Sequence, residues 1–378
     1  MAATRSRLLA SLESAIKAAG SPIEAQCLRA ERAALLARQG QLERAHGVID
    51  ELNAQLAWQP NNNLLRAWLA LAEGLHGYYS VIGREAEPTI ELAYTLAKDG
   101  GLTATRLRAT CAAWLANMAF NNDDAWPRMA TLVREALDSA AAEHHGARAR
   151  ATLVAGYAFH FGGAAGRAQH WYEASRRHAI AEGDEAHLSA LMHNQAWMRA
   201  SQARMALLFE PAGDAGAMAQ ALMGAESIGH YDAGIGTASL GSLVPMLRAQ
   251  VLVAQGRWAE ALALFTTDFD SALTEGLQRI APCLLADRAW CEWNLGRADK
   301  ARALAGAAEQ ALAEPIDNDD RAMALVRLAQ VRDALGETGR AAQDRVQSQQ
   351  LYARHREQQH QIVALLDAAL AGIDPTKA

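Results

Sequence analysis

Twelve histidines are the first residues in this chain that suggest metal binding or proton transfer. Helical zinc sites place two histidines four residues apart beside a glutamate, so that both imidazoles face one ion. His170 with His178 and His187 with His193 have other spacings and lack that carboxylate pattern. Four more histidines lie among charged residues: His144, His145, His355 and His360. We therefore expect solvated histidines and no metal site.

Two further stretches resemble ligand-binding loops in composition only. The run from Gly234 to Gly241 lacks the G-x-G-x-x-G spacing of a nucleotide loop, and no strand precedes it. Asp317-Asn-Asp-Asp320 has the carboxylates of a calcium loop but not its glycine or closing glutamate. We interpret this second run as a turn followed by a helix N-cap. The sequence predicts no cofactor.

The four cysteines are widely spread, and no C-x-x-C pair occurs among them. Cys283 and Cys291 lie about two turns apart on one predicted helix and cannot bond to each other without unwinding it. We expect Cys283 and Cys291 to be small buried packing residues rather than redox-active ones. A reduced, cytoplasmic protein is the simplest interpretation of the four separate cysteines.

These residues must be positioned by helices, because one pattern recurs at a period of 40 residues. A small residue stands seven positions before a glycine, and an alanine stands five after it. The clearest copies are Ala249, Gly256 and Ala261; Ala289, Gly296 and Ala301; and Ala329, Gly336 and Ala341. In each, the glycine ends one helix and the small residues let the next helix approach closely. A fixed period of this size is typical of a stacked-repeat solenoid.

The same triplet occurs earlier in the chain as Ala33, Gly40 and Ala45, and as Gly156, Gly163 and Ala168. The first copy predicts helices over 22–39 and 42–57. Spacing implies two degenerate repeats between the copies, one of them turning near Gly83-Arg84 and ending at Gly100-Gly101, and a fifth repeat around 184–230. The glycine-rich stretch 224–241 is interpreted as a hinge or long loop. The chain thus predicts about eight antiparallel helix pairs.

Helices are also predicted at both ends. Residues 1–20 form an N-terminal helix, the solenoid extends over 1–340, and one long helix begins near 341 within a C-terminal region 341–378. Its last turns carry an apolar stripe: Ile362, Leu365, Leu366, Ala369 and Leu370. This stripe either caps the eighth repeat or pairs with a second copy to form a homodimer.

Composition supports an all-α fold and excludes two partner classes. Hydrophobic residues make up 51% of the chain, largely alanine and leucine, and aromatic residues only 6%. A formal net charge of -6 provides no basic surface for nucleic acid. No apolar run reaches the roughly 18 residues of a transmembrane helix, so no membrane association is predicted.

The repeats resemble the tetratricopeptide family across nearly the whole chain. Its second-helix signature, an alanine followed four residues later by a bulky residue, appears as Ala45 to Ile49, Ala168 to Tyr172 and Ala261 to Phe265. The longer period and the missing first-helix tryptophan are similar to the branch found in bacterial regulatory and signalling proteins. The resemblance implies a right-handed superhelical solenoid.

In that family the first helix of each pair lines a concave groove. Carried over by distance from each turn, the implied ligand-binding positions are Trp114, Asn117, Tyr157, His160, Phe161, Gln250, Trp290, Trp293, Asn294 and Gln330. Aromatic faces beside amides suit an extended peptide. Trp290 and Trp293, three residues apart on one helix, equally suit packing between repeats.

The sequence and the resemblance leave three functional hypotheses. The first is a non-catalytic scaffold that binds a protein segment, a peptide or a small signal in the groove. The alternative is a sensor whose ligand alters the superhelix and signals through the C-terminal helix to an effector. An enzyme with a site in the glycine-rich stretch has the least support.

Overall fold

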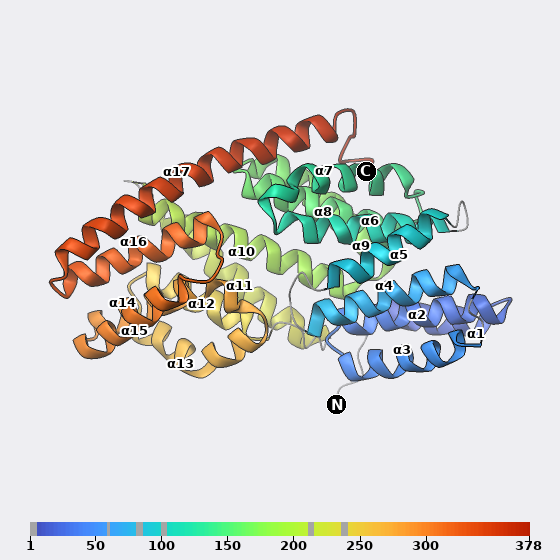
Figure 1. The fold of residues 1–378 in the computed structure, drawn as a ribbon, viewed down its shortest axis with the longest axis horizontal. Helices are drawn as coiled ribbons and strands as arrows, with labels where there is room; N and C mark the ends of the chain where they lie inside the picture. The colour runs from blue at the N-terminus through green and yellow to red at the C-terminus, as the bar shows by residue number, and fades with distance from the viewer. Residues whose placement is uncertain (1–5, 59–60, 81–85, 100–103, 211–214, 236–240) are drawn as a thin grey trace. The chain divides into compact units, whose positions relative to one another are not determined.

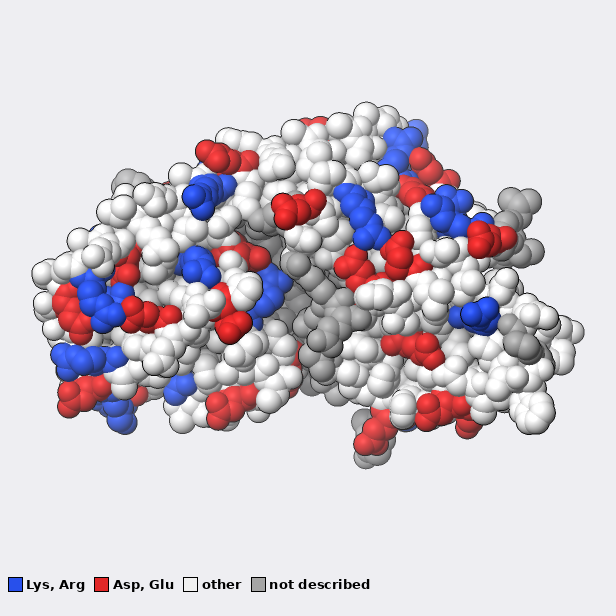
Figure 2. All heavy atoms as spheres, viewed as in Figure 1, with Lys and Arg blue, Asp and Glu red and all other residues white. Residues whose placement is uncertain are grey.

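The computed structural model describes residues 6–58, 61–80, 86–99, 104–210, 215–235 and 241–378 (Figure 1). The described residues form seventeen α-helices and no strand, which confirms the all-α fold class. None of these helices is both long and apolar enough to cross a bilayer. Figure 2 shows acidic and basic side chains interspersed over the face that it displays.

A single helix, α1 (Arg7–Ala18), precedes eight helix pairs. The first five pairs are α2 (Pro22–Arg38) with α3 (Leu42–Leu56), α4 (Asn63–Ser80) with α5 (Glu87–Asp99), α6 (Thr105–Phe120) with α7 (Trp126–Ser139), α8 (His145–Phe161) with α9 (Ala165–Glu182), and α10 (Glu185–Phe209) with α11 (Ala215–Ile235). The last three pairs are α12 (Leu243–Ala254) with α13 (Trp258–Thr274), α14 (Ala281–Asn294) with α15 (Ala298–Ala311), and α16 (Asn318–Ala334) with α17 (Thr338–Ala369). The predicted pairing is confirmed; the superhelix stays a prediction.

The turn glycines have the backbone conformation that the repeat pattern requires. Five of them have φ between +74° and +83°: Gly40, Gly163, Gly256, Gly296 and Gly336. At Gly256, the N–H of Arg257 donates to the carbonyl of Leu252 at 2.9 Å, which is the bond of a Schellman cap. A side chain at such a φ is strained, so glycine ends the first helix of these pairs.

Small residues separate the two helices of a pair, as predicted. Ala261, Ala301 and Ala341 are fully buried on second helices. At Gly156 on α8, an added Cβ would lie 2.7 Å from Cδ1 of Tyr172 on α9. The close approach of these helices therefore depends on the absence of larger side chains.

The glycine-rich stretch is not the predicted loop over most of its length. Residues 224–235 continue α11, so the hinge prediction is wrong there. Gly224 lies close to α10, since an added Cβ would be 3.8 Å from Cβ of Ala196. That distance is ordinary van der Waals contact, so packing against α10 does not require glycine at this position. Glycine inside a helix costs roughly 0.5–1 kcal/mol relative to alanine. Residues 236–240, Gly83-Arg84 and Gly100-Gly101 lie outside the described residues.

The chain divides into two compact units. The first unit comprises residues 1–191, 231–239 and 360–378, and the second comprises 192–230 and 240–359. Each unit has its own buried apolar clusters. This division was not drawn from the sequence.

The C-terminal apolar stripe is covered within the first unit. Ile362, Leu366 and Leu370 are buried in its main core, with Leu365 and Ala369 packed against it. Arg134 on α7 donates to the carbonyls of Ala369 and Ala371 at 3.3 and 3.1 Å. The prediction that this stripe caps the eighth repeat is therefore wrong, because that repeat, α16 with the start of α17, belongs to the second unit. The homodimer stays a prediction.

Candidate ligand-binding cavity

The first unit contains a cavity of about 80 Å³. Its walls come from α2, α4, α6 and α8, the first helices of four consecutive pairs, and from the start of α10. Leu8 and Leu12 of α1 add an apolar wall. Because each pair contributes its first helix, side chains far apart in sequence meet in one space.

Arginine and tryptophan side chains dominate this space. Arg38, Arg106 and Arg150 line the cavity together with Trp68 and Trp114. The Arg106 guanidinium lies 5.0 Å from the Trp68 ring centroid, and that of Arg150 lies 3.8 Å from the Trp114 ring centroid. Both are cation–π contacts, which are stronger when removed from water.

Two of the three arginines have carboxylate partners. Arg106 is paired bidentately with Glu31, at 2.9 and 2.5 Å. Arg38 Nη2 lies 2.5 Å from Asp184 Oδ2. Burial alone would raise the pKa of Asp184, but the Arg38 charge outweighs it and the pKa is lowered. These pairs are neutral as units and fix α2 to α6 and to the start of α10.

Arg150 differs from the other two. It is only 4% exposed, and its one hydrogen bond joins Nη1 to Asn117 Oδ1 at 3.5 Å. Its Nε and Nη2 are buried and have no partner among the described residues. Burial lowers the pKa of the guanidinium and the Arg38 charge lowers it further, although the group stays protonated. The cavity therefore holds a buried cation without a counter-ion bonded to it.

The turn from α9 to α10 positions the remaining polar wall. Gly183, at φ +74°, ends α9, and Asp184 Oδ1 accepts from the backbone N–H of His187 at 2.9 Å as an N-cap. The Leu8 N–H donates to the Gly183 carbonyl at 3.1 Å, which holds α1 beside this turn. Burial first, and then the Arg150 charge, lower the pKa of His187 well below its ordinary value. His187 is therefore neutral at pH 7.

A serine and a histidine beside the cavity have a spacing that also suits catalysis. Ser175 Oγ lies 2.8 Å from His187 Nε2, a nucleophile–base distance. However, Ser175 is fully buried and its hydroxyl donates to the Ala149 carbonyl at 2.9 Å. Asp184 binds the His187 backbone and Arg38, so it does not orient the imidazole. These bonds match a structural role in joining α8, α9 and α10.

The predicted positions of the first unit fall into two places. Trp114 lines the cavity, and Asn117 contacts Arg150. Tyr157 and Phe161 instead pack with Phe120, at centroid distances of 4.8 and 5.7 Å. His160 is buried, with Nδ1 3.2 Å from the Tyr172 hydroxyl. Of these five residues, Trp114 alone lines the cavity, and Asn117 reaches it only through Arg150.

Two of the five predicted positions in the second unit contact a different arginine, Arg327. Trp290 lies 5.7 Å from the guanidinium of Arg327, and Gln330 Oε1 accepts from Arg327 Nη1 at 2.6 Å. Trp293 is half-buried in an apolar cluster, Asn294 is exposed with its amide donating to its own helix, and Gln250 is buried. These five residues do not line the cavity of the first unit.

Spacing in the sequence did not predict the titratable residues of the cavity, which include Glu31, Arg38, Arg106, Glu143, Arg150, Glu182, Asp184 and His187. One signal was present for Arg150, which, like Arg148, stands between alanines in a run, 147–159, whose other residues are uncharged. A cation inside a helix that must be buried needs a partner. That partner could not be identified from spacing.

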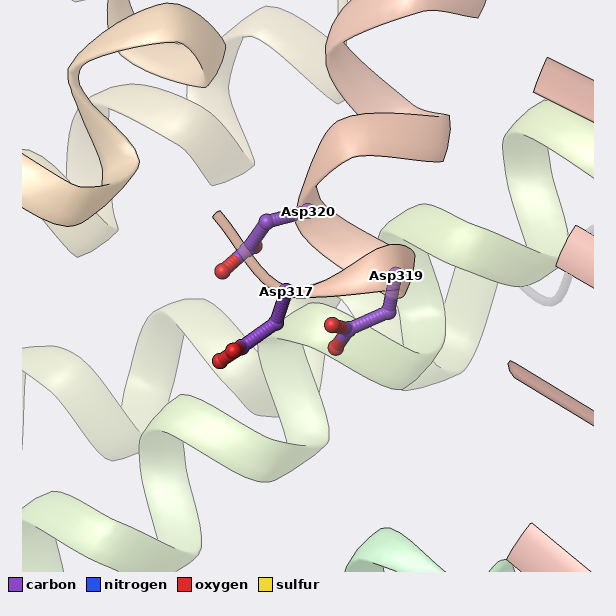
Figure 3. A group of neighbouring side chains, drawn as sticks. All are labelled: Asp317, Asp319 and Asp320. Atoms are coloured by element: carbon purple, nitrogen blue, oxygen red, sulfur yellow. The ribbon is translucent and has the colours of Figure 1, made fainter. Parts of the chain in front are cut away.

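Three carboxylates at the start of α16 form another cluster (Figure 3). Asp317, Asp319 and Asp320 place one oxygen each within 4.8 Å of the others. Asp317 stands at the N-cap position but pairs with Arg279 and makes no capping bond. Burial, and then Asp319, raise the pKa of Asp320. The cluster begins a helix, where acidic residues are favoured, as the turn-and-cap interpretation expects.

The expectation of solvated histidines is wrong for three of them, because His187, His193 and His355 are buried. Their helices present those positions to neighbouring helices, which a charge pattern in sequence does not reveal. The prediction that Cys283 and Cys291 are buried is confirmed, and Cys27 and Cys111 are buried as well. Burial raises the pKa of the Cys27 thiol to about 11 and that of Cys291 to about 12, so both are unreactive thiols at pH 7.

No protein-family model matches this chain, and no curated protein is significantly similar to it.

Proposed function

We propose that this protein is a non-catalytic binding module that takes a short segment of a partner protein or peptide in the cavity of its first unit. The proposal rests on where the cavity walls come from. Four successive first helices place Trp68, Trp114 and three arginines around one space. Aromatic and arginine side chains in a desolvated pocket are the groups that dominate binding energies. The resemblance to tetratricopeptide repeats implies the same helices as the ligand-binding ones.

The test fills the cavity without removing a core side chain. Ala34 on α2 is 6% exposed and lines the cavity, so Ala34→Leu adds three carbons to a space of about 80 Å³. Peptides are selected on the wild-type protein from a random phage-displayed library. We expect Ala34→Leu to weaken their binding by about tenfold or more, with an unchanged or higher melting temperature.

The control is Ala263→Leu, at an exposed position on α13 of the second unit. It adds the same atoms away from the cavity and should leave peptide binding unchanged. Selected peptides that bind Ala34→Leu as tightly as the wild type would contradict the cavity as the binding site.

The sensor is the second candidate, and α17 favours it. This one helix contributes residues up to Gln359 to the second unit and from His360 onward to the first. A ligand that shifts α17 would act on residues of both units. A sensor should change its radius of gyration in small-angle scattering when a selected peptide is added, whereas a passive scaffold should not.

A further inference from the structure

Three arginines of this protein lie over a tryptophan, and they differ in what neutralises them. In chain order the pairs are Arg106 over Trp68, Arg150 over Trp114, and Arg327 over Trp290. Arg106 is paired with Glu31, and Arg327 is paired with Asp287, which also pairs with Arg204. Arg150 has no carboxylate within hydrogen-bonding distance among the described residues. Of these three arginine–tryptophan pairs in the described part of the chain, Arg150 with Trp114 is the one without a carboxylate, and both residues line the cavity.

The unpartnered atoms of Arg150 define the shape of the missing anion. Nε and Nη2 lie on the same edge of a guanidinium and direct two parallel N–H bonds away from it. Both nitrogens are buried without a partner, while Nη1 is directed to Asn117. Two oxygens of one carboxylate match that edge, and such bidentate bonds are among the stronger hydrogen bonds in proteins.

The other charges of the cavity do not fill this role. Asp184 is bonded to Arg38, whose own Nε also lacks a partner among the described residues. Glu143 and Glu182 line the cavity without bonding to Arg150. Burial first, and then Glu31, raise the pKa of Glu182. The lining thus carries three arginines and four carboxyl groups, and among the described residues none of the four bonds to Arg150.

We propose that the cavity binds a carboxylate, held bidentately by Nε and Nη2 of Arg150 above the ring of Trp114. This inference rests on the proposed function and names the chemical group that the peptide would insert. A cavity of about 80 Å³ has room for a side-chain or terminal carboxylate with a few carbons. Because both nitrogens are covered, the insertion must move side chains next to Arg150. Tyr78 and Tyr79, which contact Trp114 edge-on at 5.9 and 6.2 Å, are the adjacent aromatic groups.

The first experiment uses small probes rather than an unidentified ligand. Acetate and glutarate are titrated into the full-length protein at constant ionic strength, with acetamide and inorganic phosphate as comparison arms. The Nε–H resonance of Arg150, assigned with Arg150→Lys, reports the site directly. We expect acetate and glutarate to shift this resonance saturably and acetamide to leave it unchanged. Phosphate acting more strongly than either carboxylate would replace the carboxylate assignment by a phosphate one.

The second experiment supplies the anion from the protein itself. Asn117→Asp changes one atom type beside Arg150 and gives it an internal carboxylate, so the variant should fold. We expect it to bind glutarate about tenfold or more weakly than the wild type. Asn63→Asp adds the same charge at an exposed position at the start of α4 and should bind as the wild type does. Equal glutarate binding by Asn117→Asp and wild type would overturn the proposal.

The outcomes separate this inference from the proposed function. In one outcome, library peptides bind the wild type and Ala34→Leu prevents their binding, but Asn117→Asp and amidation of the peptide carboxylates leave the affinity unchanged. The carboxylate inference then fails, and the proposed function stands. If peptides bind Ala34→Leu normally while glutarate still shifts the Arg150 resonance, the peptide function fails and the anion site stands.

Discussion

The two units of this protein bury arginines over tryptophans in the same way but neutralise them differently. In the second unit Asp287, 1% exposed, accepts from both Arg204 and Arg327, at 2.7 and 2.9 Å. In the first unit Arg150 is similarly buried; among the described residues it contacts the Trp114 ring and has one weak side-chain hydrogen bond, to Asn117. A buried charge that is paired and hydrogen-bonded maintains a structure, whereas an unpaired one costs stability.

This difference indicates which buried arginine is there for packing and which is available to a ligand. The residues of the Arg327 group satisfy one another, and a ligand could gain little by joining them. The Arg150 group lacks one partner, and a ligand that supplies it would remove an existing cost. The comparison therefore favours the first unit over the second as the binding region, although the sequence places prominent tryptophans in both.

Breaking the paired network should have the largest effect. Asp287→Asn keeps the shape of the side chain but leaves two buried guanidinium groups without a carboxylate. We expect the free energy of unfolding to fall by about 3–5 kcal/mol, measured by urea denaturation followed by circular dichroism. The control Asp270→Asn, exposed on α13, should change it by less than about 0.5 kcal/mol. A loss below about 1 kcal/mol for Asp287→Asn would show that the network is not what holds this unit together.

Lowering the pH should reduce the stability of the first unit, because His187 is buried there in its neutral form. The expected loss lies between those of Asp287→Asn and Arg150→Met. Its pKa in the folded state is well below 6.5, because of burial and the Arg150 charge. Below pH 6.5 the unfolded chain binds a proton that the folded chain does not. The stabilisation is thus complete above pH 6.5 and falls with decreasing pH by at most about 1.4 kcal/mol per pH unit, until the folded pKa is reached.

The measurement for His187 is the urea midpoint from pH 7.5 to 5, compared between wild type and His187→Asn. The urea midpoint of His187→Asn should fall less steeply between pH 6.5 and 5 than that of the wild type. His355, whose pKa burial lowers to about 4, is the counterpart in the second unit, so His355→Asn should flatten the same window independently. Identical slopes in wild type and His187→Asn would mean that Arg150 and burial do not keep His187 neutral.

Removing the unpaired cation should have the smallest effect and the opposite sign. Arg150→Met deletes a buried charge without a counter-ion but also loses its contact with Trp114. The gain from removing the buried charge and the loss of the cation–π contact nearly cancel. We therefore expect the free energy of unfolding to stay the same or rise by up to about 1 kcal/mol. The matched change Arg327→Met should cost about 1–3 kcal/mol, because Asp287 loses a hydrogen-bonded partner. Equal losses for both variants in urea denaturation would remove the distinction between the two units.

The repeat pattern in the sequence was enough to predict the local structure. Gly40 ends α2 where it was expected, and the boundaries of α3 agree with the predicted 42–57 to within one residue. This works because a helix end depends on nearby residues: a glycine that tolerates positive φ, and small side chains a few positions away. The prediction of a hinge or long loop failed over 224–235 because a helix can continue through glycine, at a cost of roughly 0.5–1 kcal/mol per residue relative to alanine. Clustered glycines therefore do not by themselves mark a helix end.

The sequence by itself thus determined the helix pairs, the small residues between them, and the turns at Gly40, Gly163, Gly256, Gly296 and Gly336. Trp114 lines the cavity, and its role in binding stays a prediction. Only the tertiary structure decided that Arg38 meets Asp184, 146 residues away, and that Arg150 meets no carboxylate. The reason is physical. Local preferences act over a few residues, whereas the pairing of buried charges depends on how successive helices stack and turn relative to one another.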